Sequence, residues 1–425
     1  MPAGVTADGF AAVMAPLARA AAIGLAVSGG PDSLALLLLA ERWARDLAAP
    51  PKLFVYSVDH GLRPEARLEV AMVMEEAARR GMSGRPLAWS GDKPATGVQE
   101  AARQARYRLI GEAMAADGAE ILVTAHHRRD QAETVLMRLA HGSGLDGLAG
   151  MAPLSVVEGV KVFRPLLSVD PEALMAMVEA EGMTPADDPS NRDPHYERVR
   201  WRSLLPRLEA LGLDNAVLAR FAERAGEAEE ALAATARQRF IDLVQLDGFG
   251  AAEIDAEAFA GMPKAIAVRV LARVLAVVGG QQNPRALGIV ERLREALVSG
   301  DVSKARTILG CVVRNAAGKV TVAREPGRQS LPAVTLLPGQ RVVWDQRFVI
   351  ANCSDADELA IRPAEYWQRR HLEELFGTRI GAPMEAIRTA PMVLDGTEAV
   401  LALGSHTFDP RVSVEFRGAW EQPLP

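Results

Sequence analysis

Cysteine is nearly absent from this chain of 425 residues, which contains only Cys311 and Cys353. Two cysteines cannot build the disulfide framework of a small secreted domain, and their separation does not match the paired spacing of a structural zinc site. The first 310 residues contain no cysteine at all. Any chemistry in that part of the chain therefore proceeds without a thiolate, a persulfide or an iron–sulfur cluster.

The chain also lacks a long hydrophobic segment and an excess of positive charge. Its apolar tracts, such as residues 34–40, are far shorter than the roughly 20 residues that a membrane-spanning helix needs. The apolar residues 1–22 include Asp8 and no basic leader, so they do not resemble a signal peptide. The net charge of −6 gives no indication of a nucleic-acid partner. Any binding to nucleic acid would have to come from local basic patches. We expect a cytoplasmic protein without a membrane partner.

The order of apolar segments predicts the fold class. Strands are predicted at residues 23–27, 53–58 and 121–125, with helices between them, and this alternation favours a parallel sheet covered on both faces. The later sequence is first alanine-rich and helical and then mixed. We predict an α/β doubly wound parallel sheet in residues 1–205, a mainly helical domain in residues 206–330 and a small mixed α+β domain in residues 331–425.

Three polar clusters directly follow predicted strands, and they begin at Ser28, Asp59 and His126. The carboxyl ends of the strands in an open parallel sheet lie at one edge, where ligands bind. Three clusters at one edge are stronger evidence for a site than any one of them alone.

The first cluster is a loop that reads Ser28-Gly29-Gly30-Pro31-Asp32-Ser33 and lies between a strand and a long helix. Glycines let the backbone approach an anion closely, and a helix N-terminus favours negative charge. The serines add donors, and Asp32 is a candidate ligand for Mg²⁺. The loop has neither the GxxxxGK[ST] spacing nor the GxGxxG fingerprint. A serine-capped glycine turn is the structural alternative, and we predict instead that the loop binds a phosphate group.

The other two clusters are ambiguous when each is considered alone. Residues 59–63 read Asp-His-Gly-Leu-Arg, and Arg106 lies on a predicted helix; both patterns are also typical of solvated charges. Asp130 and Glu133 are three residues apart and share a helix face, where they can hold a metal or receive an ammonium group. Asp130 alone also suits a helix N-terminus. One histidine of the pair 126–127 is expected to be structural.

Together these segments resemble the tRNA(Ile)-lysidine synthetase family of the N-type ATP pyrophosphatase, or PP-loop, superfamily. Loop 28–33 is similar to the SGGxDS signature of that superfamily. The similar segments keep the family order through the first half of the chain: residues 28–33, 59–63, 99–107, 126–138, 142–148, 164–167 and 187–202. The glycine segment at 142–148 and the Asp-Asp-Pro-Ser-Asn segment at 187–191 are not needed for generic ATP binding, so they carry most of the discrimination.

The resemblance implies a two-step reaction on an isoleucine tRNA with a CAU anticodon. The carbonyl oxygen at position 2 of the wobble cytidine attacks the α-phosphate of ATP, and pyrophosphate leaves. The ε-amine of free lysine then displaces AMP, which gives lysidine. ATP and Mg²⁺ are the implied cofactors, and members of the family can be homodimers.

The resemblance also implies roles for residues at matching positions. The implied catalytic residues are Asp32, which would also hold Mg²⁺, Arg106, Asp130 and Glu133. The implied substrate-binding residues are Asp59, His60, Arg63, His127, Asn191, Arg198 and Arg202. Phosphoryl transfer needs positioning and cations more than covalent help, which suits the loop and the arginines. The local stretch Arg198, Arg200, Arg202 and Arg207 either contacts tRNA phosphates or is a solvated helix face.

Two positions depart from the family pattern. Arg129 stands where the HHxDDQ segment has its first aspartate, and Val199 stands where an asparagine usually follows the arginine. Arg129 supports one alternative, a nucleotide-sensing RNA-binding protein with a degenerate site. A tRNA-thiolating enzyme of the 2-thiocytidine type is another, but it needs cysteines that the catalytic part lacks. A small-molecule adenylating synthetase would not explain the glycine segment.

Overall fold

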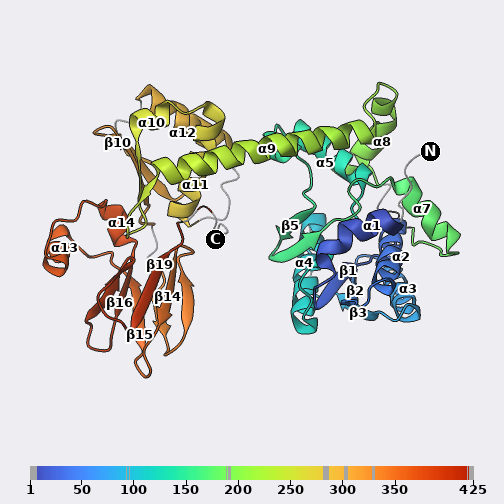
Figure 1. Ribbon diagram of the computed structural model, residues 1–425, viewed down its shortest axis with the longest axis horizontal. Helices are drawn as coiled ribbons and strands as arrows, with labels where there is room; N and C mark the ends of the chain where they lie inside the picture. Colours follow the sequence, from blue (N-terminus) through green and yellow to red (C-terminus); the bar gives the residue numbers. More distant parts are fainter. Residues whose placement is uncertain are drawn as a thin grey trace. The chain divides into compact units, whose positions relative to one another are not determined.

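The computed structural model describes residues 7–91, 93–94, 96–187, 189, 193–280, 287–300, 305–327, 331–418 and 420. The chain forms two compact units, Met1–Glu229 and Glu230–Pro425, and helix α9 (Asn215–Leu243) begins in the first and ends in the second (Figure 1). Among the described residues, no helix has the length and apolarity to cross a membrane.

The first unit is built on a six-stranded sheet with the order β3-β2-β1-β4-β6-β5. Strands β1, β2, β3, β4 and β6 pair in parallel, and only β5 runs antiparallel to its neighbour β6. The strands are β1 (Ala22–Ala26), β2 (Lys52–Asp59), β3 (Ser83–Ala88), β4 (Leu122–Val123), β5 (Leu154–Val157) and β6 (Val160–Phe163).

Helices cover both faces of this sheet because successive strand residues point to opposite sides. Leu25, Val55 and Val123 belong to an apolar cluster with α1, α2, α3 and α7. Phe54 and Leu122, each one position earlier in its strand, pack instead with α4. The helices and the short 3-10 turn are α1 (Ala7–Met14), η1 (Ala15–Leu17), α2 (Pro31–Arg45), α3 (Ala66–Arg79), α4 (Val98–Asp117), α5 (Arg128–Ala140), α6 (Leu145–Leu148), α7 (Pro171–Ala180) and α8 (Glu197–Glu209).

Helix α8 packs against α5 within the first unit. Val135 and Leu136 of α5 form an apolar cluster with Leu205 of α8 and Leu218 of α9. The predicted domain boundary after residue 205 therefore falls inside a helix that is attached to the catalytic part. The domain boundaries stay predictions, and the contact matters because it brings the arginines of α8 to α5.

The second unit begins with helices packed on a five-stranded sheet of the order β7-β8-β11-β10-β9. Buried residues of α11, such as Val270 and Leu271, meet Val313 and Val322 of the sheet in one apolar cluster. The elements are β7 (Gln245–Leu246), β8 (Ala252–Asp255), α10 (Ala256–Ala260), α11 (Lys264–Gly279), α12 (Leu287–Ser299), β9 (Arg306–Ile308), β10 (Cys311–Ala316) and β11 (Lys319–Arg324).

The last part of the second unit is mainly antiparallel strands. They form a sheet of order β12-β15-β16-β17-β18 and another of order β13-β14-β19, which share a core that includes Trp344, Phe348 and Ile361. The elements are β12 (Val334–Leu336), β13 (Arg341–Trp344), β14 (Phe348–Asn352), β15 (Leu359–Pro363), α13 (Arg369–Phe376), α14 (Met384–Arg388), β16 (Pro391–Leu394), β17 (Val400–Leu403), β18 (His406–Thr407) and β19 (Val412–Phe416). The predicted fold class is confirmed: a mostly parallel α/β sheet, then helical segments, then a mixed C-terminal part.

Candidate active site

The order of the strands places a site at the carboxyl ends of β1 and β4. Chain order reverses between these neighbouring strands, because β2 and β3 lie on one side of β1 and β4 lies on the other. Such a switch point leaves a crevice where ligands bind. The loop that contains Ser28 follows β1, and His126 and His127 follow β4, so two of the three predicted polar clusters meet there.

The loop after β1 is held in shape by the hydroxyl group of Ser33. Its Oγ accepts hydrogen bonds from the backbone N–H groups of Ser28 and Gly29, both at 3.2 Å, and donates to the carbonyl oxygen of Gly30 at 2.9 Å. Gly30 is the N-cap of α2, and Pro31 occupies the first helical turn, where it needs no N–H partner. The helix N-terminus and its partial positive charge therefore face the loop.

Gly29 shows why this loop needs a glycine. Its φ of +90° lies in the left-handed region, and a Cβ there would lie 3.2 Å from Cε of Met72 and 3.5 Å from Cβ of Ala186. The carbonyl oxygen of Gly29 accepts a hydrogen bond from the backbone N–H of Ala186 at 2.9 Å. The chain just before the Asp-Asp-Pro-Ser-Asn segment is thereby fixed against the loop.

His127 connects this loop to α5. Its backbone N–H donates to Oδ2 of Asp130 at 3.0 Å, and its ring Nδ1 accepts from the backbone N–H of Asp130 at 3.4 Å, which makes a capping box at the start of α5. This arrangement leaves the ring proton on Nε2, which lies 3.4 Å from Oδ2 of Asp32. The side chain of Asp32 is 36% exposed and so faces the solvent side of the loop.

Asp130 and Glu133 meet two arginines from α8. Asp130 Oδ1 accepts from Arg198 Nη2 at 2.7 Å. Glu133 is completely buried, and its two oxygens accept from Arg198 Nε at 2.5 Å and Arg202 Nε at 2.7 Å. Burial would raise the pKa of Asp130, but the His127 side chain, the charge of Arg198 and the hydrogen bond from the His127 backbone N–H outweigh that effect and lower it. Asp130 is therefore held as an anion beside the loop.

His126 belongs to the site, although it is not among the predicted site residues. Its Nδ1 lies 2.8 Å from the hydroxyl oxygen of Thr124. Burial, together with the charges of Arg164, Arg198 and Arg103, lowers the pKa of His126 to about 4 against the partial opposition of Asp130. His126 is therefore neutral at physiological pH, whereas His127 fills the structural role expected for one histidine of the pair.

The cluster after β2 lies with α4 rather than with the carboxylates of α5. Arg106 Nη2 lies 3.2 Å from His60 Nε2. Asp59 accepts from the backbone N–H of Gly61 at 2.7 Å, which shapes the turn. Arg63 donates to both oxygens of Glu69 at 3.1 Å. This cluster places the cations Arg63 and Arg106 at the same edge of the sheet. The predicted substrate-binding residue Asn191 lies outside the described residues.

Arg129 points away from the carboxylate cluster. It pairs with Glu172 at the start of α7, and its neighbour Arg128 pairs with Asp170 and donates to the carbonyl oxygen of Ser168. These contacts fasten α5 to α7. The arginine that replaces the family's aspartate is thus a packing residue in this chain, and it does not add a positive charge between Asp130 and Asp32.

The donor set fits a magnesium ion that arrives with a nucleoside triphosphate. Among the described residues there is no group of three or more histidine, cysteine, aspartate or glutamate side chains placed to hold a metal. Asp32 stands at the start of α2 beside the phosphate-type loop. Mg²⁺ is usually held by one or two carboxylates together with substrate phosphates and water. One exposed carboxylate is therefore enough here.

Comparisons with known proteins identify the family. A family model described as the PP-loop domain matches residues 5–208. The tRNA(Ile)-lysidine synthase of Bradyrhizobium sp. (strain BTAi1 / ATCC BAA-1182) is 47% identical over 293 residues, which cover 67% of this chain and 82% of that protein. The enzyme of the same name from Ruegeria pomeroyi is 34% identical over 390 residues, 89% of this chain and 88% of that protein.

This chain belongs to the tRNA(Ile)-lysidine synthase family. A third member, from Rhodopseudomonas palustris, is 44% identical over 320 residues and covers 73% of this chain and 92% of that protein. Membership in the family confirms the predicted use of ATP through the PP-loop domain and the predicted class of enzyme, an ATP-using ligase. It leaves the sulfur-transfer and small-molecule alternatives without support.

Proposed function

We propose that this protein joins free lysine to position 2 of the wobble cytidine in isoleucine tRNA with a CAU anticodon, with conversion of ATP to AMP and pyrophosphate. The observation that carries the proposal is the pair of carboxylates, Asp130 and Glu133, held beside a PP-loop in a member of this family. Lysine carries a positive charge, and carboxylates beside an adenylating loop are what its side chain requires.

The first step adenylates the base. The cytidine O2 attacks the α-phosphorus, the bond to the bridging oxygen breaks, and pyrophosphate leaves with the electron pair. The N–H groups at the start of α2 and the hydroxyl of Ser28 bind phosphate oxygens, and Arg106 places a cation at the same edge. Asp32 would hold Mg²⁺, which would supply further positive charge to the phosphates.

The second step forms the carbon–nitrogen bond. The lysine ε-amine attacks carbon 2 of the adenylated base, and AMP leaves with the former O2. Asp130, which is 13% exposed, receives the ammonium group, and Glu133 holds Arg198 and Arg202 next to it. The ammonium must lose a proton before it attacks.

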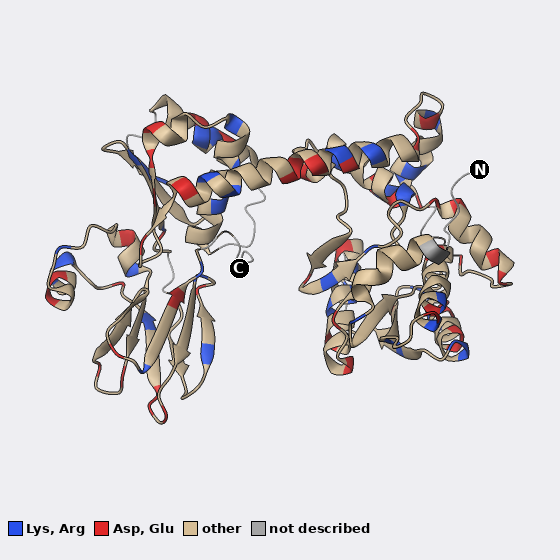
Figure 2. Cartoon of the chain, in the orientation of Figure 1, with Lys and Arg blue, Asp and Glu red and all other residues tan. Residues whose placement is uncertain are grey.

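The tRNA must bind through local patches because the protein is acidic overall. Figure 2 shows lysine and arginine residues gathered along α8 and the adjoining part of α9. Arg200 and Arg207 lie on α8, and Arg220 and Arg224 follow on α9. We propose that these side chains bind RNA phosphates. We also propose a cytoplasmic location. We further propose a homodimer, and a measurement of mass in solution tests it.

Pyrophosphate exchange tests the proposal one step at a time. Without lysine, the protein with ATP, Mg²⁺ and the CAU isoleucine tRNA should exchange labelled pyrophosphate into ATP. Methionine tRNA, which shares the anticodon, should support much less exchange. Adding lysine should end the exchange by consuming the adenylated base. No exchange with the cognate tRNA at saturating ATP and Mg²⁺ would contradict the proposal.

A further inference from the structure

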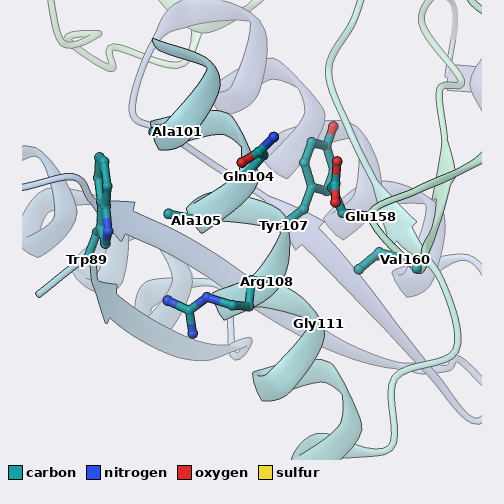
Figure 3. A pocket seen from close by; sticks show the side chains of 10 residues that line it. Trp89, Ala101, Gln104, Ala105, Tyr107, Arg108, Gly111, Glu158 and Val160 are labelled. Carbon is teal, nitrogen blue, oxygen red and sulfur yellow. The ribbon is translucent and has the colours of Figure 1, made fainter. Parts of the chain in front are cut away.

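A pocket of about 650 Å³ opens along α4 and takes no part in the chemistry described above. Helix α4 forms its floor with Ala101, Ala105 and Gly111, which are small, and Trp89 stands across from the helix at one side (Figure 3). Glu158, in the turn between β5 and β6, lies at the other side. The pocket therefore combines one broad aromatic wall with a floor of small residues.

Trp89, which forms one wall of this pocket, contacts the cluster of polar residues that follows β2. The backbone N–H of Trp89 donates to the carbonyl oxygen of Asp59 at 2.8 Å. Its ring meets the ring of His60 edge-on, with the centroids 6.3 Å apart, and His60 in turn contacts Arg106 at 3.2 Å. Trp89 therefore lies at the carboxyl edge of the sheet, next to the residues that follow β2.

The polar groups of the pocket suit a nucleobase and its backbone. Gln104 offers both a donor and an acceptor, and Glu158 accepts hydrogen bonds, as the exocyclic amino group of a base requires. Arg108 lies on the same face of α4, and Lys93 Nζ lies 3.7 Å from the centroid of the Trp89 ring. Aromatic stacking with nearby cations is the general means of holding unpaired nucleotides.

We propose that this pocket, the Trp89 pocket, binds an unpaired nucleotide of the tRNA that is a neighbour of the modified cytidine in the anticodon loop. Its base stacks on Trp89 and its edge faces Gln104. The inference rests on the proposed function, because that function makes a single-stranded loop the substrate. Enzymes that act on one base of a loop must splay the loop open, and each displaced neighbour then needs a surface of its own.

Binding of an anticodon stem-loop to the full-length protein at fixed salt tests this pocket. Trp89→Ala should weaken binding about tenfold, and Trp89→Phe should restore most of the loss, because stacking tolerates a change of ring. Ala101→Phe, at a half-buried helix position, should fill the pocket and weaken binding by a similar factor. Each variant should keep the thermal unfolding of the parent protein, which excludes a general loss of fold.

The nucleotide is found by replacing each loop position in turn with an abasic residue. One position should weaken binding to the parent protein as much as Trp89→Ala does, and the two changes together should cost no more than either alone. If the losses add at every position, or if Trp89→Ala binds like the parent, the inference is wrong. A raised KM for ATP with unchanged RNA binding would assign the pocket to the nucleotide instead and would also overturn it.

Lysidine formation by the parent protein distinguishes a failure of this inference from a failure of the proposed function. If the parent fails to form lysidine on the complete tRNA, the proposed function fails. If it forms lysidine and only the Trp89 comparisons give no effect, the pocket alone has been assigned wrongly. In the expected case, Trp89→Ala raises the KM for tRNA about tenfold while kcat at saturating tRNA changes little.

Discussion

We expect the adenylation chemistry to depend most on Asp32. It lies in the first turn of α2. Its Oδ2 is 3.4 Å from Nε2 of His127, and its side chain is 36% exposed. Asp32→Asn should lower tRNA-dependent pyrophosphate exchange on the order of 100-fold or more, since it removes charge at the phosphate site. The free energy of unfolding should change by less than about 1 kcal/mol, because an exposed charge at a helix N-terminus stabilises little. Exchange close to normal would show that another group holds Mg²⁺.

His126 should make the protein sensitive to mild acid. Its pKa is about 4 in the folded protein against 6.5 for an unperturbed histidine. The unfolded chain therefore binds more protons between those two values, and stability falls as the pH drops through that window. We expect His126→Gln to lose less stability than the parent between pH 7 and pH 5 in urea unfolding. Equal losses would mean that His126 is already solvated in the folded protein.

The sequence reveals a site residue only when its role depends on neighbouring residues in the chain. Loop 28–33 is identifiable because its function depends on consecutive residues, and Gly29 adopts the positive φ that such a loop needs. His126 gave no comparable signal, because its neutrality arises from burial and from arginines far away in the chain. Trp89 gives no comparable signal either, since a lone tryptophan after a strand has no pattern of its own.

At the scale of elements, α5 and α8 are joined by an ion-pair network centred on Glu133. The predicted i, i+3 spacing placed Asp130 and Glu133 on one face of α5, and both indeed meet Arg198. No spacing in the sequence indicates that the arginines come from a helix more than sixty residues later. That pairing depends on the apolar contact between the two helices, in which Leu136 meets Leu205.

This network predicts unequal effects of removing its members. Glu133→Gln should destabilise the protein by about 1–3 kcal/mol, because two arginines lose a buried partner but remain partly in contact with water. Arg202→Gln should cost less, since Glu133 keeps Arg198. Chemical denaturation of both single variants and of the double variant measures the coupling. If Arg202→Gln proves the more damaging change, Glu133 is not the centre of the network.

Glu133→Gln should also separate the two chemical steps. The loosened Arg198 changes the surroundings of Asp130, where the lysine ammonium is expected, while the PP-loop keeps its own hydrogen bonds. The KM for lysine should therefore rise more than the KM for ATP. Equal changes in both constants would indicate that Glu133 acts only through stability.

At the scale of the whole molecule, we expect the two cysteines to take no part in the chemistry. Cys311 is buried in β10 and burial raises its pKa to about 12, whereas Cys353 is exposed. A thiol reagent should label one site in the folded protein, and Cys353→Ser should remove that labelling with lysidine formation unchanged. Labelling of Cys311 in the native state, or loss of activity after alkylation of Cys353, would reopen a role for sulfur.

The organisation of the chain was only partly visible in its sequence. Alternating strands and helices were enough to predict the parallel sheet, because buried strands are continuous apolar runs. In the alanine-rich stretch, short strands such as β7 and β8 are hidden, since two to four residues carry no clear period. Their pairing with β11 is non-local, so only the three-dimensional structure reveals it.

The most direct test is nucleoside analysis of CAU isoleucine tRNA after incubation with the protein, ATP, Mg²⁺ and isotopically labelled lysine. The account predicts lysidine at the wobble position, with the label retained in the nucleoside and one AMP formed per lysine incorporated. A wobble cytidine that stays unmodified, in a tRNA that the protein binds, would contradict it.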